Sequence, residues 1–270
     1  MNLGLEGKRA LVTGSTGGIG AATVKMLAAE GAAVIIHGRN EARAQALKAE
    51  IEAAGGKAAL ALGDLLSDET APEVLQPALA AFGGIDILVN NLGHYEPLAA
   101  NWMDATPEEF AYTYQVNVIA AVRAVHAALP GMKERGWGRI INIASGAYTQ
   151  PPPEFPTYGP AKAALVNLSV GLARALPLSG VTVNTVSPGN TLTETMLSYL
   201  PRIGEANGWP ETDVYEIEKR FVREQWPSPL GRMGRVEEIA ALICFLASTH
   251  AAYITGTNYR IDGGAHATLN

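Results

Sequence analysis

The segment Thr13-Gly-Ser-Thr-Gly-Gly-Ile-Gly20 begins at the end of a short apolar strand pattern, residues 10–13, and leads into a helical pattern at residues 21–30. Glycines in a turn between a strand and a helix let the backbone approach a pyrophosphate, whose charge the helix amino terminus stabilises. Gly14, Gly18 and Gly20 give the spacing Gly-x3-Gly-x-Gly. The segment therefore predicts a dinucleotide site, with a tight turn that binds no ligand as the alternative.

Strand and helix patterns alternate from this segment to the end of the chain. Apolar runs bounded by turn residues predict further strands at residues 33–37, 57–62, 85–90, 138–145, 181–187 and 258–264. Helices are expected between them, with Asn40, Ser67 and Thr106 as capping residues, and the helix after Thr106 should run to about residue 129. We therefore expect an α/β fold, a Rossmann-type doubly wound three-layer sandwich with a mainly parallel seven-stranded sheet.

The length and composition of the chain suit one domain over residues 1–270. No linker, internal repeat or low-complexity tract divides the chain, and a doubly wound sheet commonly grows to this size around a single core. Residues 190–230 are irregular, with four prolines and several large apolar side chains. We expect a partly helical substrate flap there.

The charge and the cysteine content exclude some partners. A net charge of −6 and a pI near 5.4 give no field that attracts nucleic acid or an anionic membrane. The single cysteine, Cys244, lies in an apolar run and is expected to be a buried packing residue, so no disulfide can form within the chain. No signal core and no membrane-spanning run are present. We expect a cytoplasmic protein.

A second motif, Tyr158-Gly-Pro-Ala-Lys162, places a phenol and an ammonium on one face of a helix. A positive charge close to a phenol favours the phenolate, so such a tyrosine can exchange a proton near neutral pH. Ser145 lies thirteen residues upstream at the end of a predicted strand. Pro160 would be costly within a helix, so the helix is expected to begin close to Tyr158 or to kink there.

The end of the second predicted strand bears on the choice of cofactor. An acidic side chain there would bind the ribose 2′-hydroxyl of NAD and repel the 2′-phosphate of NADP. That place holds Gly38, and Arg39 follows with a guanidinium suited to a phosphate monoester. Ser15 is expected to add a hydroxyl donor to the same phosphate, and the alternative for Arg39 is a solvated charge at a helix start. The sequence favours NADP(H) over NAD(H).

Several motifs occur together in an order that matches one known family. The matching pieces are Thr-Gly-x3-Gly-Ile-Gly at residues 13–20, Asp64, Asn90-Asn-Leu-Gly93, Asn117, Ser145, Tyr158-x3-Lys162, Pro188-Gly189 and Asp262-Gly-Gly264. From Thr13 to Gly264 the chain resembles the classical short-chain dehydrogenase/reductase family. Leu92 stands where that family usually has alanine, and we expect it to alter packing beside the cofactor pocket.

The resemblance implies hydride transfer between a nicotinamide ring and a carbonyl or secondary alcohol. Tyr158 would be the general acid or base, and Lys162 would favour the phenolate and hold the nicotinamide ribose. Ser145 would hydrogen-bond the substrate oxygen, and Asn117 would hold a water that links Lys162 to solvent. Taken singly, Ser145 could simply end a strand and Asn117 could be a satisfied buried side chain. With Tyr158 and Lys162 at family spacing, the functional interpretation is favoured.

The resemblance also implies where the cofactor and the substrate lie. The expected cofactor-binding residues are Gly14, Ser15, Thr16, Gly18, Ile19, Gly20, Arg39, Asp64, Leu65, Asn90, Asn91, Gly93, Tyr158, Lys162, Pro188, Gly189, Thr191 and Thr193. Of these, Asp64 is expected at the adenine edge, Asn90 and Gly93 on the adenosine-ribose side, and Pro188, Gly189 and Thr191 or Thr193 on the nicotinamide side. The candidate substrate contacts are His94, Tyr95, Ala147, Tyr148, Phe155 and Met196. No cluster of His, Cys or carboxylates has metal-ligand spacing, so no catalytic metal is expected.

The predicted function is that of an NADP(H)-dependent oxidoreductase acting on a small carbonyl compound or alcohol. One alternative is a 3-oxoacyl-[acyl-carrier-protein] reductase. Ser179 stands where those enzymes usually carry a basic residue, although Lys133, Arg135 and Arg139 could still form a basic patch. The alternative from another class is a dinucleotide-binding sensor without turnover. The resemblance further implies a homotetramer.

Overall fold

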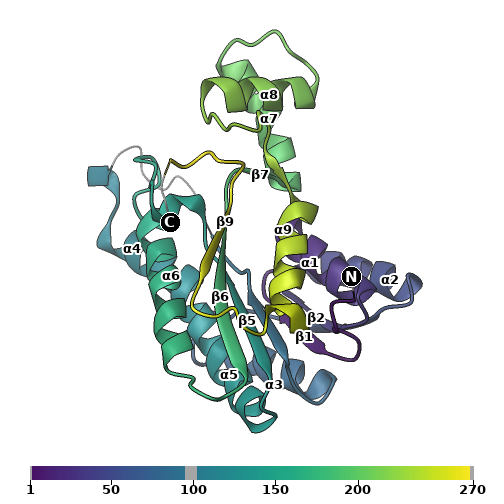
Figure 1. Ribbon diagram of the computed structural model, residues 1–270. Coiled ribbons are helices and arrows are strands. Elements are labelled where there is room, and N and C mark those ends of the chain that lie inside the picture. Colours follow the sequence, from purple (N-terminus) through teal and green to yellow (C-terminus); the bar gives the residue numbers. More distant parts are fainter. Residues whose placement is uncertain (1, 95–101, 268–270) are drawn as a thin grey trace.

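The structure, a computed structural model, describes residues 2–94 and 102–267, which form a parallel sheet covered by helices on both faces (Figure 1). Seven strands lie in the order β3-β2-β1-β4-β5-β6-β9, and each neighbouring pair is parallel. The strands are β1 (Arg9–Val12), β2 (Ala33–Gly38), β3 (Lys57–Leu62), β4 (Ile87–Asn90), β5 (Gly138–Ile143), β6 (Val181–Pro188) and β9 (Asn258–Ile261). The predicted fold class is confirmed.

Helices from both halves of the chain form the two outer layers. They are α1 (Gly18–Ala29), α2 (Glu41–Ala53), α3 (Ala71–Ala81), α4 (Pro107–Tyr114), α5 (Ala120–Glu134), α6 (Tyr158–Arg174) and α9 (Val236–Ala247). One apolar cluster joins α1, α2 and α9 to the sheet, and a second joins α3 and α5 to its other face. Val34 and Ile36 of β2 belong to the first cluster and Ile35 to the second, because successive strand residues point to opposite faces.

Two of the three predicted helix caps are confirmed. Asn40 accepts a backbone N–H at the start of α2, and Thr106 forms a capping box with Glu109 at the start of α4. The predicted cap at Ser67 is wrong, because α3 begins four residues later, after Thr70. The Ser67 hydroxyl instead accepts the Thr70 N–H, at 3.2 Å, within the turn that precedes the helix.

The helix predicted from Thr106 to about residue 129 is longer and interrupted. A π-helical segment, η2 (Gln115–Ile119), separates α4 from α5, and α5 continues through Pro130 to Glu134. A proline inside a helix removes one hydrogen bond, which here does not end the helix. The inserted segment carries Asn117, whose place in the site is described below.

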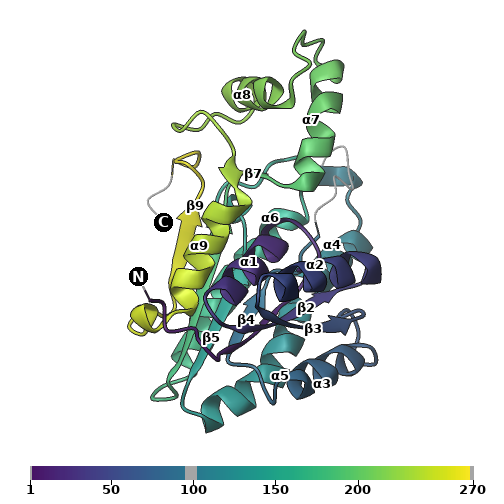
Figure 2. The ribbon, with the colours of Figure 1, turned by 90° about the vertical axis from the view of Figure 1, so that its right-hand side faces the viewer.

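The predicted flap is a helical extension at the carboxyl-terminal edge of the sheet (Figures 1 and 2). It consists of α7 (Glu194–Ala206) and α8 (Val214–Glu224), and two short strands, β7 (Thr191–Leu192) and β8 (Gly234–Arg235), pair in parallel at its base. Leu200, Ile217 and Phe221 are buried in an apolar cluster of its own. The extension therefore packs internally while its base meets the site.

Cys244 is a packing residue, as the sequence predicts. Its side chain is 1% exposed within the first core cluster, and burial raises the pKa of its thiol to about 12. Across the two described segments, no helix has both the length and the apolar character needed to cross a membrane.

Candidate active site

The glycine loop between β1 and α1 has a backbone that glycine adopts without strain. Gly14 and Gly18 have φ angles of +62° and +53°, in the left-handed region. A Cβ on Gly20 would lie 2.7 Å from the Gly14 carbonyl oxygen, so α1 packs directly on the loop. The N-cap of α1, Gly17, offers no side-chain bond, and the first turn has no acidic residue. The N–H groups at this helix terminus therefore suit the pyrophosphate of a dinucleotide.

A buried histidine that no sequence motif indicated holds this loop. His37 lies in β2 and is 2% exposed, and its Nδ1 accepts the Gly14 backbone N–H at 2.9 Å. Burial lowers the pKa of His37 to about 4, because the charged ring is disfavoured away from water. The ring is therefore neutral and keeps the lone pair that the bond to Gly14 needs. The signal in the sequence was a histidine inside an otherwise apolar strand.

Ser15 connects the glycine loop to β2 by hydrogen bonds. It is completely buried, its Oγ accepts the His37 backbone N–H at 3.0 Å, and its own N–H donates to the His37 carbonyl at 2.8 Å. The Ser15 hydroxyl, predicted to donate to a 2′-phosphate, is enclosed in this structure and bonded to the His37 backbone of β2.

The end of β4 holds the loop from the other side. The Asn91 amide donates to the carbonyls of Thr13 and Gly14, at 3.0 and 2.9 Å. Thr13 Oγ1 in turn accepts the backbone N–H groups of Asn91 and Leu92, both at 3.0 Å. The Leu92 side chain packs against the core cluster under α3 and α5. The β4 end and the glycine loop thus form one rigid unit.

Arg39 follows the end of β2, where the sequence predicts a phosphate ligand. A Cβ on Gly38 would lie 2.5 Å from Thr16 Cγ2, so the Thr16 side chain covers this strand end. Arg39 is exposed and forms no ion pair with another residue in the part of the chain that the structure describes. Its guanidinium is therefore available for an anion at this end of β2.

Three more predicted cofactor residues lie at the carboxyl-terminal ends of β3 and β4. Asp64 accepts the Leu66 backbone N–H at 3.0 Å. Leu65 is 1% exposed within the core, and Asn90 is 3% exposed and donates to Asn142 Oδ1 at 2.8 Å. The side chains of Leu65 and Asn90 therefore belong to the interior, and only their backbone remains for a cofactor.

Tyr158 begins α6, and Pro160 lies in the first turn of that helix. An N–H in the first turn has no partner within the helix, so the proline costs little there. The helix start predicted from Pro160 is confirmed. Tyr158 is half-buried, and Lys162 Nζ lies 5.4 Å from the centroid of its ring.

Lys162 carries its amine in the interior of the protein. It is 3% exposed, its Nζ donates to the Ile143 carbonyl at 2.9 Å, and within the described segments it forms no ion pair. Burial lowers the pKa of Lys162 to about 7, because an ammonium loses its hydration there. A titratable group with so strong a shift is typical of a functional site.

Asn117 and Lys162 meet at Gly93. A Cβ on Gly93 would lie 3.0 Å from Asn117 Oδ1 and 3.1 Å from Lys162 Nζ. Asn117 lies in the π-helical segment η2, an insertion often found at functional sites. Its amide binds both the N–H and the carbonyl of His94, at 3.3 and 3.0 Å, and the Thr113 carbonyl at 2.9 Å. Asn117 thereby fixes the backbone after β4 beside Lys162.

Ser145 lies just beyond the end of β5 and precedes the short 3-10 helix η3 (Gly146–Tyr148). It is half-buried, and its Oγ accepts the Ala147 backbone N–H at 3.3 Å. Because β4, β5 and β6 are parallel neighbours, Ser145 lies at the same sheet edge as Gly93 and Gly189.

The residues predicted for the nicotinamide side follow β6. The Gly189 N–H donates to the Ile261 carbonyl at 3.0 Å, and Thr191 Oγ1 donates to the Gly189 carbonyl at 3.0 Å. Thr193 caps α7. A Cβ on Gly18 would lie 3.4 Å from Thr193 Cγ2. The base of the helical extension therefore meets the glycine loop, as a shared ligand site requires.

The candidate substrate contacts differ in their surroundings. The His94 ring packs edge-on against Tyr112 of α4, with centroids 5.8 Å apart. Tyr148 and Phe155 are half-buried, Ala147 is buried, and Met196 packs against the apolar cluster of the extension. Tyr95 lies outside the described residues.

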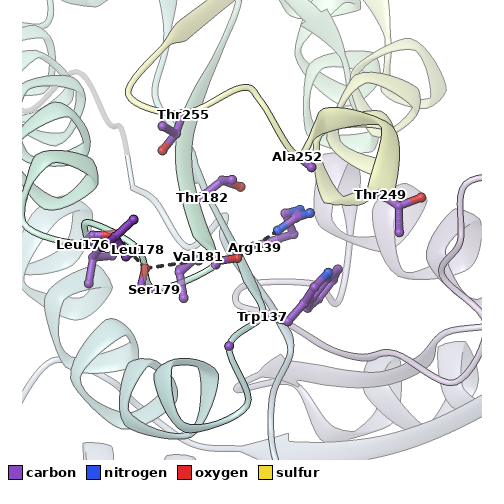
Figure 3. A pocket seen from close by; sticks show the side chains of 12 residues that line it. Trp137, Arg139, Leu176, Leu178, Ser179, Val181, Thr182, Thr249, Ala252 and Thr255 are labelled. Carbon is purple, nitrogen blue, oxygen red and sulfur yellow. Dashed lines mark hydrogen bonds between the residues drawn. The ribbon is translucent and has the colours of Figure 1, made fainter.

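A cavity of about 420 Å³ lies at the opposite edge of the sheet, at the amino-terminal ends of β5 and β6 (Figure 3). Trp137, Arg139, Leu178 and Thr182 line it. Since none of the predicted site residues borders this cavity, it is separate from the candidate active site.

The sequence comparisons agree with this geometry. A family described as enoyl-(acyl carrier protein) reductase matches residues 14–266. The oxidoreductase YvrD of Bacillus subtilis is 40% identical over 271 residues, covering 100% of both chains. D-β-hydroxybutyrate dehydrogenase of Cupriavidus necator is 36% identical over 262 residues, covering 96% of this chain and 98% of the relative. The chain belongs to the classical short-chain dehydrogenase/reductase family.

A solved short-chain dehydrogenase/reductase shares the whole architecture. L-sorbose reductase from Gluconobacter frateurii, crystallised with NADPH and L-sorbose, has a TM-score of 0.92 and 32% identity, covering 100% of both chains. As a member of the short-chain dehydrogenase/reductase family, this protein is an oxidoreductase that acts on CH–OH groups with a nicotinamide cofactor.

Proposed function

We propose that this protein interconverts a ketone and a secondary alcohol with NADP(H), with Tyr158 as the general acid or base. The observation that carries the proposal is the Lys162 amine, which is 3% exposed, has no carboxylate partner among the described residues and lies 5.4 Å from the Tyr158 ring centroid. Keeping such an amine costs stability, and its charge beside a phenol favours the phenolate. That arrangement suits a tyrosine that must both give and take a proton.

Four side chains have roles when the carbonyl is reduced, those of Tyr158, Ser145, Lys162 and Asn117. NADPH, when bound, supplies the hydride. Tyr158 donates its phenolic proton to the carbonyl oxygen, and Ser145 donates a hydrogen bond to the same oxygen as charge develops on it. Lys162 stabilises the resulting phenolate and holds the ribose hydroxyl groups. Asn117 positions the backbone beside Lys162 and a water that returns the proton from solvent.

The preference for NADPH rests on Arg39 and Thr16. No acidic residue occupies the end of β2, where the Thr16 side chain covers Gly38 and the exposed Arg39 follows in the chain. An arginine with a neighbouring hydroxyl suits a 2′-phosphate. L-sorbose reductase, which shares the fold, was crystallised with NADPH, and this supports the same choice here.

A ketone reduction assay tests the proposal. The purified protein is mixed with NADPH and a panel of small ketones, and the loss of NADPH absorbance is followed. We expect turnover with at least one ketone, a loss of at least a thousandfold in Tyr158→Phe, and unchanged NADPH binding in that variant. NADPH binding without oxidation across the panel, unchanged in Tyr158→Phe, would support the sensor and refute the enzyme.

The carrier-protein alternative is tested in the same assay. D-β-hydroxybutyrate dehydrogenase and L-sorbose reductase, both similar over nearly the whole chain, carry names of free small molecules. A 3-oxoacyl-[acyl-carrier-protein] reductase of Vibrio cholerae is also 35% identical. Because Ser179 replaces a basic residue expected in such reductases, we expect a free ketone to be reduced more efficiently than a carrier-bound 3-oxoacyl group.

A further inference from the structure

His266, close to the end of the described chain, packs on the turn that carries Ser145. A Cβ on Gly146 would lie 2.6 Å from His266 Nε2 and 2.8 Å from its Nδ1, so the imidazole occupies the space directly beside the Gly146 backbone. Gly146 follows Ser145, the proposed partner of the reacting oxygen. A segment more than a hundred residues away in sequence therefore brings an imidazole to the carbonyl side of the site.

Asp262 fixes the orientation of this ring. One carboxylate oxygen, Oδ2, accepts the His266 backbone N–H at 3.1 Å and lies 2.8 Å from His266 Nδ1. The same oxygen lies 3.1 Å from Arg260 Nε, and Oδ1 accepts the Gly264 N–H at 2.9 Å. Burial alone would raise the pKa of Asp262, but bonds from His266 and Gly264 and the charge of Arg260 together lower it. Asp262 is therefore an ionised acceptor.

The tautomer of His266 follows from that acceptor. Because an ionised carboxylate can only accept, Nδ1 must carry the proton that it donates to Asp262. In a neutral ring, Nε2 then keeps its lone pair and is an acceptor. Among residues 2–94 and 102–267, Nε2 has no hydrogen-bond partner, and the side chain is 11% exposed. Within the described segments, the ring is therefore bonded through Nδ1 alone.

The unit of Asp262 and His266 touches both sides of the proposed reaction site. A Cβ on Gly189 would lie 2.8 Å from Asp262 Cα, and Gly189 belongs to the predicted nicotinamide side. His266 packs on Gly146, next to Ser145. A substrate carbonyl bound at Ser145 and facing the nicotinamide would have its neighbouring carbon close to this pair.

We propose that His266 is a substrate-binding residue whose Nε2 accepts a hydrogen bond from a hydroxyl group on the carbon next to the reacting carbonyl. The substrate class is then the hydroxy ketones, and the product is a vicinal diol. The inference rests on the proposed ketone reduction and refines it. A plain ketone offers Nε2 no donor, whereas a hydroxy ketone satisfies an acceptor already oriented by Asp262.

A matched pair of ketones tests this role. 3-Hydroxy-2-butanone and 2-butanone differ by one hydroxyl on the carbon next to the carbonyl. We expect the wild type to prefer the hydroxy ketone in kcat/KM. His266→Ala should lower kcat/KM for the hydroxy ketone about tenfold, the scale of one hydrogen bond, and leave 2-butanone within about twofold. His266→Gln keeps an amide oxygen near the position of Nε2 and should retain part of the preference.

His250→Ala is the matched control, because His250 Nε2 bonds the Asn2 carbonyl at 2.7 Å, away from the site residues. It should leave both ketones unchanged. Thermal unfolding of each variant separates a folding defect from a lost contact, and His266→Gln carries the test if His266→Ala unfolds.

The outcomes separate this inference from the proposed function. A wild type that reduces neither ketone nor any other of the panel contradicts the proposed function itself. A wild type that reduces ketones, with equal effects of His266→Ala on both members of the pair, overturns the role of His266 alone. A loss confined to oxo acids such as acetoacetate would assign Nε2 as a donor to a carboxylate and would overturn the hydroxyl assignment.

Discussion

Replacement of Lys162 by methionine is expected to stabilise the cofactor-free protein while it removes activity. Burial lowers the pKa of Lys162 to about 7, whereas in the unfolded chain the amine keeps the ordinary value of a lysine. Linkage converts this difference into about 4 kcal/mol of lost stability at pH 7. Methionine has a similar length without a charge. It leaves the Ile143 carbonyl without the donor at 2.9 Å, at a cost of about 2 kcal/mol.

The net gain for Lys162→Met is therefore about 2 kcal/mol at pH 7, or about 5 °C in Tm for a chain of this size. The pH dependence has a definite sign. Between pH 7 and the unfolded-state pKa, the unfolded chain binds more protons at this site than the folded chain, so wild-type stability rises with pH. At pH 9.5 about 3 kcal/mol of the destabilisation that Lys162 causes at pH 7 has disappeared. The variant should then be slightly less stable than the wild type.

Urea unfolding followed by circular dichroism at pH 7 and pH 9.5 measures both differences. Other titrating groups cancel because each variant is compared with the wild type at the same pH. Lys133→Met, at an exposed lysine of α5, is the control and should differ from the wild type by less than about 0.5 kcal/mol at both values. A Lys162→Met protein that is less stable by the same amount at both pH values would refute a charge penalty at this site.

Three further substitutions test other parts of the site and the fold. Gly93→Ala adds a Cβ 3.0 Å from Asn117 Oδ1 and should lower kcat at least tenfold in steady-state kinetics, because it displaces the Asn117 amide. An unchanged kcat would argue against a role of Asn117 in the reaction. Arg39→Ala should raise KM for NADPH at least tenfold and leave KM for NADH unchanged, and equal effects on both cofactors would remove Arg39 from the phosphate site. Asp86→Asn breaks ion pairs to Arg9 and Arg135 and should cost about 2 kcal/mol at pH 7 in urea unfolding. Burial raises the pKa of Asp86, but the hydrogen bonds and charge of Arg9 and the charge of Arg135 outweigh burial and lower this pKa overall. The stability lost in Asp86→Asn should therefore shrink as pH falls below about 4. A loss that stays constant with pH would contradict a role for the ion pairs.

Residue patterns within short segments predicted those helices, strands and turns whose positions depend on neighbouring residues in the sequence. The glycine spacing at residues 13–20 indicated a strand, a turn and a helix, and the structure has β1 and α1 there. Pro160 placed the start of α6 at Tyr158, because a proline is tolerated only in the first turn. The mainly parallel sheet followed from the alternation of strands and helices along the chain.

Contacts between distant residues were not predictable from such patterns. Ser15 was expected to face a phosphate, but its hydroxyl is bonded to His37, more than twenty residues away. The contact of His266 with Gly146 joins segments more than a hundred residues apart. The π-helical segment at Asn117 was also missed, because π-helical turns are rare and no glycine or proline marks residues 115–119.

In the proposed reaction, a hydride passes from NADPH to a carbonyl carbon while Tyr158 supplies the proton. The most direct measurement is mass spectrometry of the alcohol formed from a ketone and NADPH that carries deuterium on the reactive carbon of its nicotinamide ring. We expect one deuterium per product molecule, bound to the carbon of the former carbonyl, and no product with Tyr158→Phe. A product without deuterium, or equal product with Tyr158→Phe, would contradict this mechanism.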